Sequence, residues 1–278
     1  YYPRPNFAPL NMSKLPLRDR HVVLTRPEGR GTDWKDHLME AGASVAELPL
    51  IEISFEPDAI VLTEVLDGMG EYDWLVFTSP NGVRGFFDRF FERFPDIRSV
   101  GGVKIACVGP ATEKAVRSFH LEPDLTAAQA DAVSLARKLI TDFNVENQKI
   151  LVAAGNLSTA ELPRLLMEDG LAIVDVLRVY STEEKPVTES PEAAEFRARG
   201  ADAIVFASPS AVESFMHQAA SLRPAAGARQ PKAIAIGATT ALRAPLPALR
   251  AAVVPSGRAA RERGADSIRW HEAGAGAR

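Results

Sequence analysis

The sequence contains one cysteine, five histidines and no long apolar run, and each shortage excludes a class of protein. The single thiol, Cys107, cannot form an intrachain disulfide, and its place in an apolar β-type run predicts a buried structural cysteine. The histidines are scattered without metal-ligand spacing, so we expect no metal site. No apolar run reaches the roughly 18 residues that a membrane span needs, and no signal-peptide pattern occurs. We therefore expect a cytoplasmic protein without a membrane partner.

Positive and negative charges nearly balance. The net charge of −4 disfavours a nucleic-acid partner. At 278 residues, with 46% apolar and 24% charged residues, the chain has the size and composition of two globular domains. Residues 1–19 hold four prolines and predict a tail or linker, while residues 258–278, rich in Arg, Ala and Gly, predict a disordered tail. A G-x-G-x-x-G pattern fails at Trp34, and the sequence has neither a phosphate loop nor a G-x-S-x-G elbow.

What the chain does contain is an internal repeat. Two stretches recur: WLVFTSPNGV at 74–83 as AIVFASPSAV at 203–212, and IACVGPAT at 105–112 as AIAIGATT at 233–240. The offset is 129 residues for Ser79 and Ser208, and 128 for the glycines of the second stretch. A nearly constant offset indicates duplication of a whole unit, and two copies favour a pair of similar domains rather than a solenoid.

Short apolar runs alternate with helical patterns along the chain, which predicts an α/β fold with mainly parallel sheets. Strands are expected at 22–24, 45–51, 74–77, 104–108, 149–152 and 176–180, helices at 33–39, 60–69, from 80, 111–119 and 131–139, a linker at 181–192 and a loop at 223–231. In the helix from residue 80, one aromatic stripe is expected to pack in the core: Val83, Phe86, Phe87, Phe90 and Phe91.

Each repeated stretch places a strand directly before a helix. Ser79 and Ser208 are suited to cap these helices, and Pro80 and Pro209 suit the first helical position. In a parallel sheet such turns lie at the carboxyl ends of strands, where ligands usually bind. Helix N-termini there present N–H groups and partial positive charge. The residues by themselves therefore predict a protein that binds a multiply anionic small molecule.

Seven short stretches carry a family resemblance through their order and spacing. They are LTRPEG at 24–29, LPLIEI at 48–53, DWLVFTSPNGV at 73–83, VGPAT at 108–112, GNL at 155–157, VYST at 179–182 and IGATT at 236–240. Over roughly residues 20–243 the chain resembles the uroporphyrinogen-III synthase family. It departs from the family pattern after Thr240, where Pro245 and Pro247 interrupt the expected helix.

The resemblance implies an enzyme that cyclises the linear tetrapyrrole hydroxymethylbilane, with loss of water and inversion of the last pyrrole ring, and that needs no metal or organic cofactor. It also implies two similar doubly wound parallel-sheet domains around a cleft, joined by two crossing connectors. Residues 20–52 with 183–257 would form one domain, and residues 55–179 the other. Two thin connectors imply hinge closure on the substrate.

The substrate implied by the resemblance carries eight carboxylates, and charge-assisted hydrogen bonds from N–H groups to carboxylates are stronger than neutral ones. Arg26 and Lys149 are candidate charge partners. Helix capping alone is the alternative role for each hydroxyl, and a solvated surface arginine is the alternative for Arg26. The candidate substrate ligands at or beside the repeated turns are Thr25, Arg26, Ser79, Asn81, Thr112, Asn156, Ser208, Ser210, Thr239 and Thr240.

The implied reaction begins when hydroxide leaves ring A with help from a proton donor, after which ring D attacks and a spiro intermediate fragments and recloses. By resemblance, Tyr180 at the end of an expected strand is the candidate catalytic donor. Phenols keep their proton at neutral pH, and a positioned donor commonly adds about 10²-fold or more to a rate. The alternatives are a tyrosine that packs at a domain junction, and catalysis mainly by folding the substrate so that its ends meet.

Two other functions stay open. The chain could be a non-enzymatic, two-lobed cytosolic module that binds an anionic small molecule, or an interaction domain carried on a longer polypeptide. Feeding hydroxymethylbilane distinguishes them, because spontaneous closure yields the type I isomer and only the enzyme yields type III. The expected partner is the tetrapyrrole substrate, bound by a monomer that is fused to, or works beside, another enzyme of the pathway.

Overall fold

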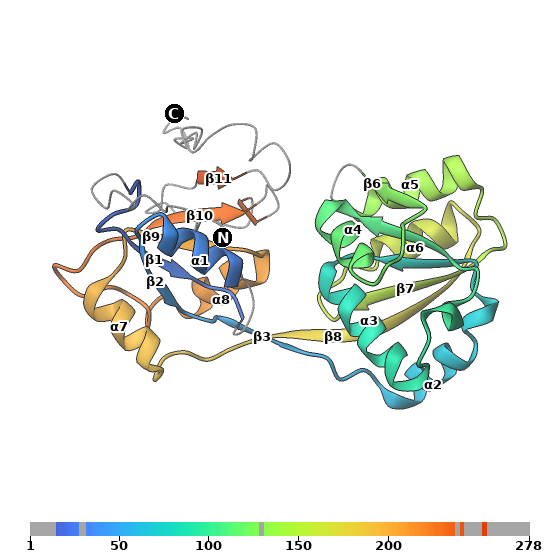
Figure 1. Ribbon diagram of the computed structural model, residues 1–278, viewed down its shortest axis with the longest axis horizontal. Coiled ribbons are helices and arrows are strands. Elements are labelled where there is room, and N and C mark those ends of the chain that lie inside the picture. The colour runs from blue at the N-terminus through green and yellow to red at the C-terminus, as the bar shows by residue number, and fades with distance from the viewer. Residues whose placement is uncertain (1–14, 28–31, 128–130, 237–239, 242–251, 255–278) are drawn as a thin grey trace, which may run out of the picture. The chain divides into compact units, whose positions relative to one another are not determined.

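The computed structural model describes residues 15–27, 32–127, 131–236, 240–241 and 252–254 (Figure 1). The chain forms two compact units: unit 1 runs up to Glu52 and resumes at Glu184, and unit 2 is Ile53–Glu183. Within the described ranges, no helix is long and apolar enough to cross a membrane, and no group of three His, Cys, Asp or Glu side chains could hold a metal ion. Most of the predicted terminal tails lies outside these ranges.

Unit 1 is built on a parallel sheet with the strand order β11-β10-β9-β1-β2. The bounds are Ala252–Val254 (β11), Lys232–Ile236 (β10), Ala203–Phe206 (β9), His21–Leu24 (β1), Ser44–Glu47 (β2), Thr32–Glu40 (α1), Pro191–Arg199 (α7) and Pro209–His217 (α8). Helices α7 and α8 cover one face through Phe196 and Phe215, and α1 covers the other through Trp34 and Leu38. Helices on both faces make this sheet doubly wound.

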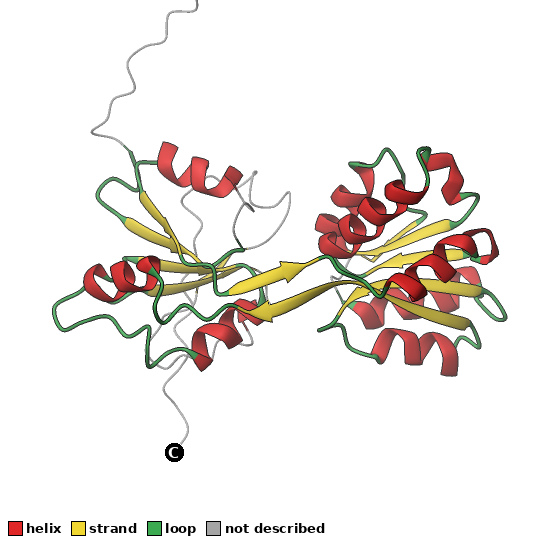
Figure 2. Cartoon of the chain, turned by 90° about the horizontal axis from the view of Figure 1, so that it is seen from below, coloured by secondary structure: helices red, strands yellow, loops and turns green. Residues whose placement is uncertain are grey.

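Unit 2 is built on a six-stranded sheet with the order β3-β8-β7-β4-β5-β6, in which β8 to β6 are parallel neighbours. The bounds are Ile51–Ser54 (β3), Ile173–Glu184 (β8), Lys149–Gly155 (β7), Trp74–Phe77 (β4), Lys104–Val108 (β5), Leu125–Ala127 (β6), Ala59–Asp67 (α2), Met69–Glu71 (η2), Pro80–Arg93 (α3), Ile97–Val100 (η3), Gly109–Arg117 (α4), Ala132–Phe143 (α5) and Glu161–Glu168 (α6). Figure 2 shows helices on both faces of this sheet: α2, α3 and α4 on one, α5 and α6 on the other.

The two sheets share one strand order. Read along the sheets, β10-β9-β1-β2 of unit 1 corresponds to β5-β4-β7-β8 of unit 2. The pairing registers correspond as well, because Val22 lies opposite Ala203 in unit 1 and Ile150 lies opposite Trp74 in unit 2. These residues differ by the offsets of the sequence repeat. Each sheet thus combines the first strands of one repeat with later strands of the other.

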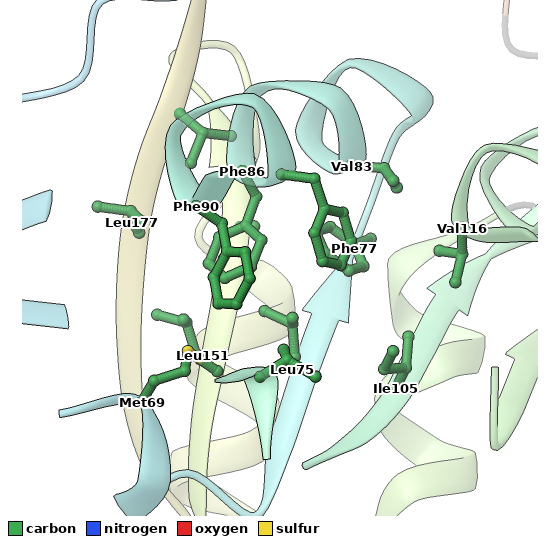
Figure 3. Close-up of a cluster of buried hydrophobic side chains, with 14 of the residues drawn as sticks. Met69, Leu75, Phe77, Val83, Phe86, Phe90, Ile105, Val116, Leu151 and Leu177 are labelled. Carbon is green, nitrogen blue, oxygen red and sulfur yellow. The ribbon is translucent and has the colours of Figure 1, made fainter. Parts of the chain in front are cut away.

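The aromatic stripe of α3 lies on the sheet of unit 2 (Figure 3). Phe86, Phe87 and Phe90 are 0% exposed, and burial of each ring contributes about 1.5–3 kcal/mol. The prediction for Phe91 is wrong: it is 38% exposed, and its ring packs at the edge of the cluster, 6.2 Å between centroids from Phe87 and from Phe119. Cys107 belongs to this cluster at 0% exposure, which confirms the predicted buried thiol, and burial raises its pKa.

Two predicted segment boundaries are wrong, although most strands lie where the sequence predicts them. The strand expected at 45–51 is in fact two strands, β2 and β3, in different sheets. Pro49, which lacks the N–H that a ladder needs, lies between them. The linker expected at 181–192 is strand up to Glu184, because β8 keeps β3 as a partner, and the N–H of Lys185 still bonds the carbonyl of Leu50 at 2.9 Å.

Candidate functional site

The carboxyl edge of the unit 2 sheet carries the turn from β4 into α3. Ser79 caps this helix: its Oγ accepts a hydrogen bond from the N–H of Gly82 at 3.0 Å, and Pro80 takes the first helical position. This geometry confirms the predicted cap. The first turn of α3 therefore places the partial positive charge of a helix N-terminus at the sheet edge.

Tyr180 reaches the same turn from β8. Its hydroxyl oxygen lies 3.0 Å from the Oγ of Ser79, and both residues are half-buried. Because Ser79 Oγ already accepts from Gly82, one lone pair and its own proton remain to bond the phenol. The two hydroxyls therefore form a connected pair at the helix N-terminus, in which either oxygen can donate. Such a pair can hold an anionic group and can deliver a proton to it.

A β-bulge aims Tyr180 at α3. Ala154 of β7 pairs with Arg178 of β8, but the next residue, Gly155, pairs with Tyr180, so that Val179 is the extra residue. Regular alternation would send Val179 and Tyr180 to opposite faces, whereas both contact the core cluster beneath α3. Gly155 leaves room for the ring, because a Cβ there would lie 2.3 Å from the Cζ of Tyr180.

Two glycines let α3 approach the sheet closely at this edge. A Cβ on Gly82 would lie 2.9 Å from the carbonyl oxygen of Ala153, and one on Gly85 would lie 2.7 Å from that of Val179. The backbone of α3 therefore lies directly against β7 and β8. The sequence pattern did not predict this contact; glycines three residues apart within a helix were the available signal, since they share one helical face.

The turn after β7 places Asn156 beside Tyr180. The N–H of Asn156 bonds the carbonyl of Tyr180 at 3.2 Å, and its side-chain amide bonds the N–H and the carbonyl of Thr182 at 2.8 and 3.1 Å. The amide thus continues the β7–β8 ladder by one side chain. This arrangement holds the end of β8 in place, while contact between Asn156 and substrate stays a prediction.

Asn81 and Thr112 lie at the same edge with different exposure. Asn81 is the second residue of α3 and is half-buried, whereas Thr112, the fourth residue of α4, is 2% exposed. A hydroxyl buried to this extent has little surface for a ligand. In the first turn of α4, Gly109 is also buried and Pro110 has no N–H, so Ala111 is the exposed residue there that has a backbone donor.

The carboxyl edge of unit 1 carries the second set of predicted residues. Ser208 confirms its predicted role as the cap of α8, since its Oγ accepts from the N–H of Ala211 at 3.3 Å. The same Oγ lies 3.0 Å from that of Ser210. Thr25 and Arg26 follow β1, the parallel neighbour of β9, so all four residues share one edge.

Several predicted ligands in unit 1 already contact other groups. Thr25 is 0% exposed and its hydroxyl donates to the carbonyl of Val205 at 2.9 Å, which extends the β1–β9 pairing. The guanidinium carbon of Arg26 lies 4.0 Å from the ring centroid of Trp34. Thr240 is 3% exposed, and Thr239 lies outside the described residues. Substrate contact by these residues stays a prediction.

Lys149 lies at the opposite end of its strand. It is the first residue of β7, so it belongs to the amino edge of the sheet, away from Ser79. Its Nζ pairs with Glu71 at 2.8 Å and lies 4.8 Å from the ring centroid of Tyr72. The prediction of Lys149 as a charge partner at the ligand-binding edge is therefore wrong, because strand direction decides which edge a side chain reaches.

Comparisons with known proteins agree with one another. A family model described as uroporphyrinogen-III synthase HemD matches residues 32–260. A porphyrin biosynthesis protein HemD from Ruminiclostridium josui is 28% identical over 61% of this chain and 33% of its own length. A uroporphyrinogen-III synthase from Synechococcus elongatus is 25% identical over 59% of this chain and 62% of its own. The chain thus matches less than two thirds of the length of these relatives.

A solved structure shows the same fold. A mutant uroporphyrinogen III synthase from the extremely thermophilic bacterium Thermus thermophilus superposes with a TM-score of 0.57 at 18% identity. The superposition covers 81% of this chain and 87% of the other. The likeness therefore extends over both units and is not confined to a single βα motif.

Proposed function

We propose that this chain, which belongs to the uroporphyrinogen-III synthase family, cyclises hydroxymethylbilane to uroporphyrinogen III. The reaction releases water and inverts the last pyrrole ring. The observation that carries the proposal is the hydroxyl pair at the sheet edge, where Tyr180 lies 3.0 Å from Ser79 at the N-terminus of α3. It supplies a proton donor beside a site suited to carboxylates.

Tyr180 is the proposed catalytic acid. As the C–O bond of the ring A hydroxymethyl group breaks, the phenol gives its proton to the departing oxygen, which leaves as water. The remaining cation is attacked by ring D, and the spiro intermediate then fragments and recloses. The pyrrole finally loses one proton, which restores the phenol and balances the reaction. Ser79, which contacts the phenol oxygen, would stabilise the transient phenolate by donating a hydrogen bond from its hydroxyl group.

The edges of the sheets are the proposed carboxylate-binding surfaces. The first turns of α3 and α8 carry the positive ends of their helix dipoles, and a charge-assisted bond from such a turn to a carboxylate is about twice as strong as a neutral one. Asn81 and Ser210 lie in these first turns and are half-buried. The other predicted ligands that the structure describes would bind substrate carboxylates through the backbone of their turns, or through their side chains after a small change of rotamer.

Isomer analysis of Tyr180→Phe tests the proposal. Fresh hydroxymethylbilane is added, and the oxidised type I and type III products are separated. The native chain should yield type III, and Tyr180→Phe should lower the turnover number by about 10²-fold without abolishing it, because substrate folding still contributes. Type I product alone from the native chain would contradict the proposed function and favour a binding module.

Tyr72→Phe is the matched control. Tyr72 is a buried tyrosine of unit 2 whose hydroxyl donates to Asp175 at 2.8 Å, near the amino edge of the sheet. Its loss should reduce stability but leave turnover per folded molecule unchanged. Equal turnover in Tyr180→Phe and the native chain would remove Tyr180 from the mechanism.

The enzyme is further proposed to act in the cytoplasm as a monomer, without metal or organic cofactor. It is also proposed to be fused to, or to work beside, another enzyme of the pathway; the match covers only 33% of the Ruminiclostridium relative, so that relative is the longer polypeptide. Light scattering of the purified chain should give the mass of a monomer. Activity should be unchanged after treatment with a chelator, because no metal is needed.

A further inference from the structure

Phe55 lies against the proposed catalytic tyrosine. Its ring centroid is 6.3 Å from that of Tyr180, at an interplanar angle of 42°. Phe55 follows β3, and Tyr180 lies in β8, the strand hydrogen-bonded to β3. Phe55 also touches α3, because a Cβ on Gly85 would lie 3.0 Å from its Cδ1. The phenylalanine therefore lies against both the tyrosine ring and the helix that Ser79 caps.

Arg89 fastens Phe55 to that helix. Its guanidinium donates two hydrogen bonds to the carbonyl oxygen of Phe55, from Nη2 at 2.6 Å and from Nε at 3.2 Å. The third nitrogen, Nη1, pairs with Glu92 at 2.6 Å, which orients the group. Residues 55–58 have no regular secondary structure, so this fork anchors a segment that no ladder holds.

A single hydrogen bond to Ser79 does not by itself fix the orientation of a phenol ring. The oxygen can keep its partner while the ring tilts, unless the ring has neighbours that limit the tilt. Gly155 provides one contact surface and Phe55 another. Two residues of the α3 segment thus restrain Tyr180. Ser79 at the N-cap bonds the phenol oxygen, and Arg89, ten residues further along, holds Phe55 against the ring.

We infer that Phe55 and Arg89 are positioning residues that hold Tyr180 in its proton-donating orientation, an inference that rests on the proposed function. Arg89 acts through Phe55, and Phe55 acts through the tyrosine ring. Loosening the ring should lower kcat by about tenfold, because misplacement of a reacting group by a fraction of an ångström already weakens catalysis. KM should change little, because the carboxylate-binding turns are untouched.

Arg89→Gln and Phe55→Leu are the test variants, with Arg93→Gln as the matched control. Arg93 lies on the same helix and pairs with the exposed Asp67, away from Phe55. The assay measures kcat and KM for hydroxymethylbilane by the type III product formed. We expect kcat to fall about tenfold in both test variants and to stay at the native value in the control. In a Tyr180→Phe background, Arg89→Gln should cause no further loss, because its effect passes through the phenol hydroxyl.

Nuclear magnetic resonance of ring-labelled tyrosine gives a readout that does not need activity. The chain has four tyrosines, and the signal lost in Tyr180→Phe identifies the relevant one. Arg89→Gln keeps the Phe55 ring, so a shifted or averaged Tyr180 signal in this variant reports movement of the tyrosine. The signal should stay unchanged in Arg93→Gln.

The outcomes separate the two proposals. Failure of the native chain to form type III product would contradict the proposed function, and the resonance experiment would still decide whether Arg89 orients Tyr180. A native kcat in Arg89→Gln and Phe55→Leu, or a Tyr180 signal that is unchanged in Arg89→Gln, would overturn the positioning role. A lower melting temperature with native kcat per folded molecule would assign both residues to stability alone.

Discussion

Replacement of Gly155 by alanine is the sharpest perturbation of the site. The new Cβ would lie 2.3 Å from Cζ, 2.6 Å from Cε2 and 2.7 Å from the hydroxyl oxygen of Tyr180. Ordinary van der Waals contact begins at 3.4 Å, so the ring must retreat by about 1.1 Å (3.4 − 2.3). The bulge that places Tyr180 opposite residue 155 prevents the strand itself from giving way without loss of pairing.

Two magnitudes follow from this displacement. A retreat of about 1 Å takes the phenol oxygen from 3.0 Å to beyond hydrogen-bond distance of Ser79, and a misplacement of that size costs about 10²-fold in rate. Overpacking costs about 1–3 kcal/mol of stability, which the lower entropy of the unfolded alanine variant offsets by about 0.4–1 kcal/mol. We expect a net loss of up to about 2.6 kcal/mol in the free energy of unfolding.

Urea unfolding and the type III assay measure the two effects. Gly102→Ala is the control, because no atom lies within 4 Å of the Cβ that it adds. Removal of the ring in Gly155→Ala with Tyr180→Ala should relieve the clash, so that the two substitutions couple favourably in stability by about 1–2 kcal/mol. If Gly155→Ala proves as stable and as active as Gly102→Ala, the close packing of Tyr180 on Gly155 is not part of the working site.

Two predictions concern stability outside the site. Asp131→Ala should lower the free energy of unfolding by about 0.5–2 kcal/mol, because Oδ1 of Asp131 caps α5 by accepting from the N–H of Ser134 at 2.7 Å. Urea melts measure this loss, with Asp142→Ala at the far end of the helix as a control; equal midpoints would refute the cap. His21 is 5% exposed, and burial, aided by Arg199, lowers its pKa below the ordinary 6.5. The unfolded chain therefore binds the proton more readily, and stability should be full above about pH 6.5 and decline below it. His21→Gln should flatten this decline relative to the exposed control His37→Gln, and an unchanged profile would contradict it.

Local chemistry made part of this protein predictable from sequence. Ser79 and Ser208 could be recognised as caps because capping depends on a side chain and the N–H groups of the next three residues. The burial of Cys107 followed from its apolar neighbours. The nearly constant offset between repeated stretches indicated two similar units, and the two sheets do share one strand order. The place of Lys149 at the amino edge was already implied by the expected strand at 149–152, because Lys149 is the first residue of that strand.

Tertiary structure decided the features that depend on contacts between distant segments. The extra residue Val179 turns Tyr180 toward α3, and no pattern in β8 alone shows where its partner strand shifts register. The fork from Arg89 to Phe55 and the fit of Tyr180 on Gly155 join residues that are 34 and 25 positions apart. Sequence by itself determined the corners where strands meet helices, since neighbouring residues build them. The orientation of the Tyr180 side chain within such a corner was decided only by tertiary packing, because it depends on the space left between neighbouring strands and α3.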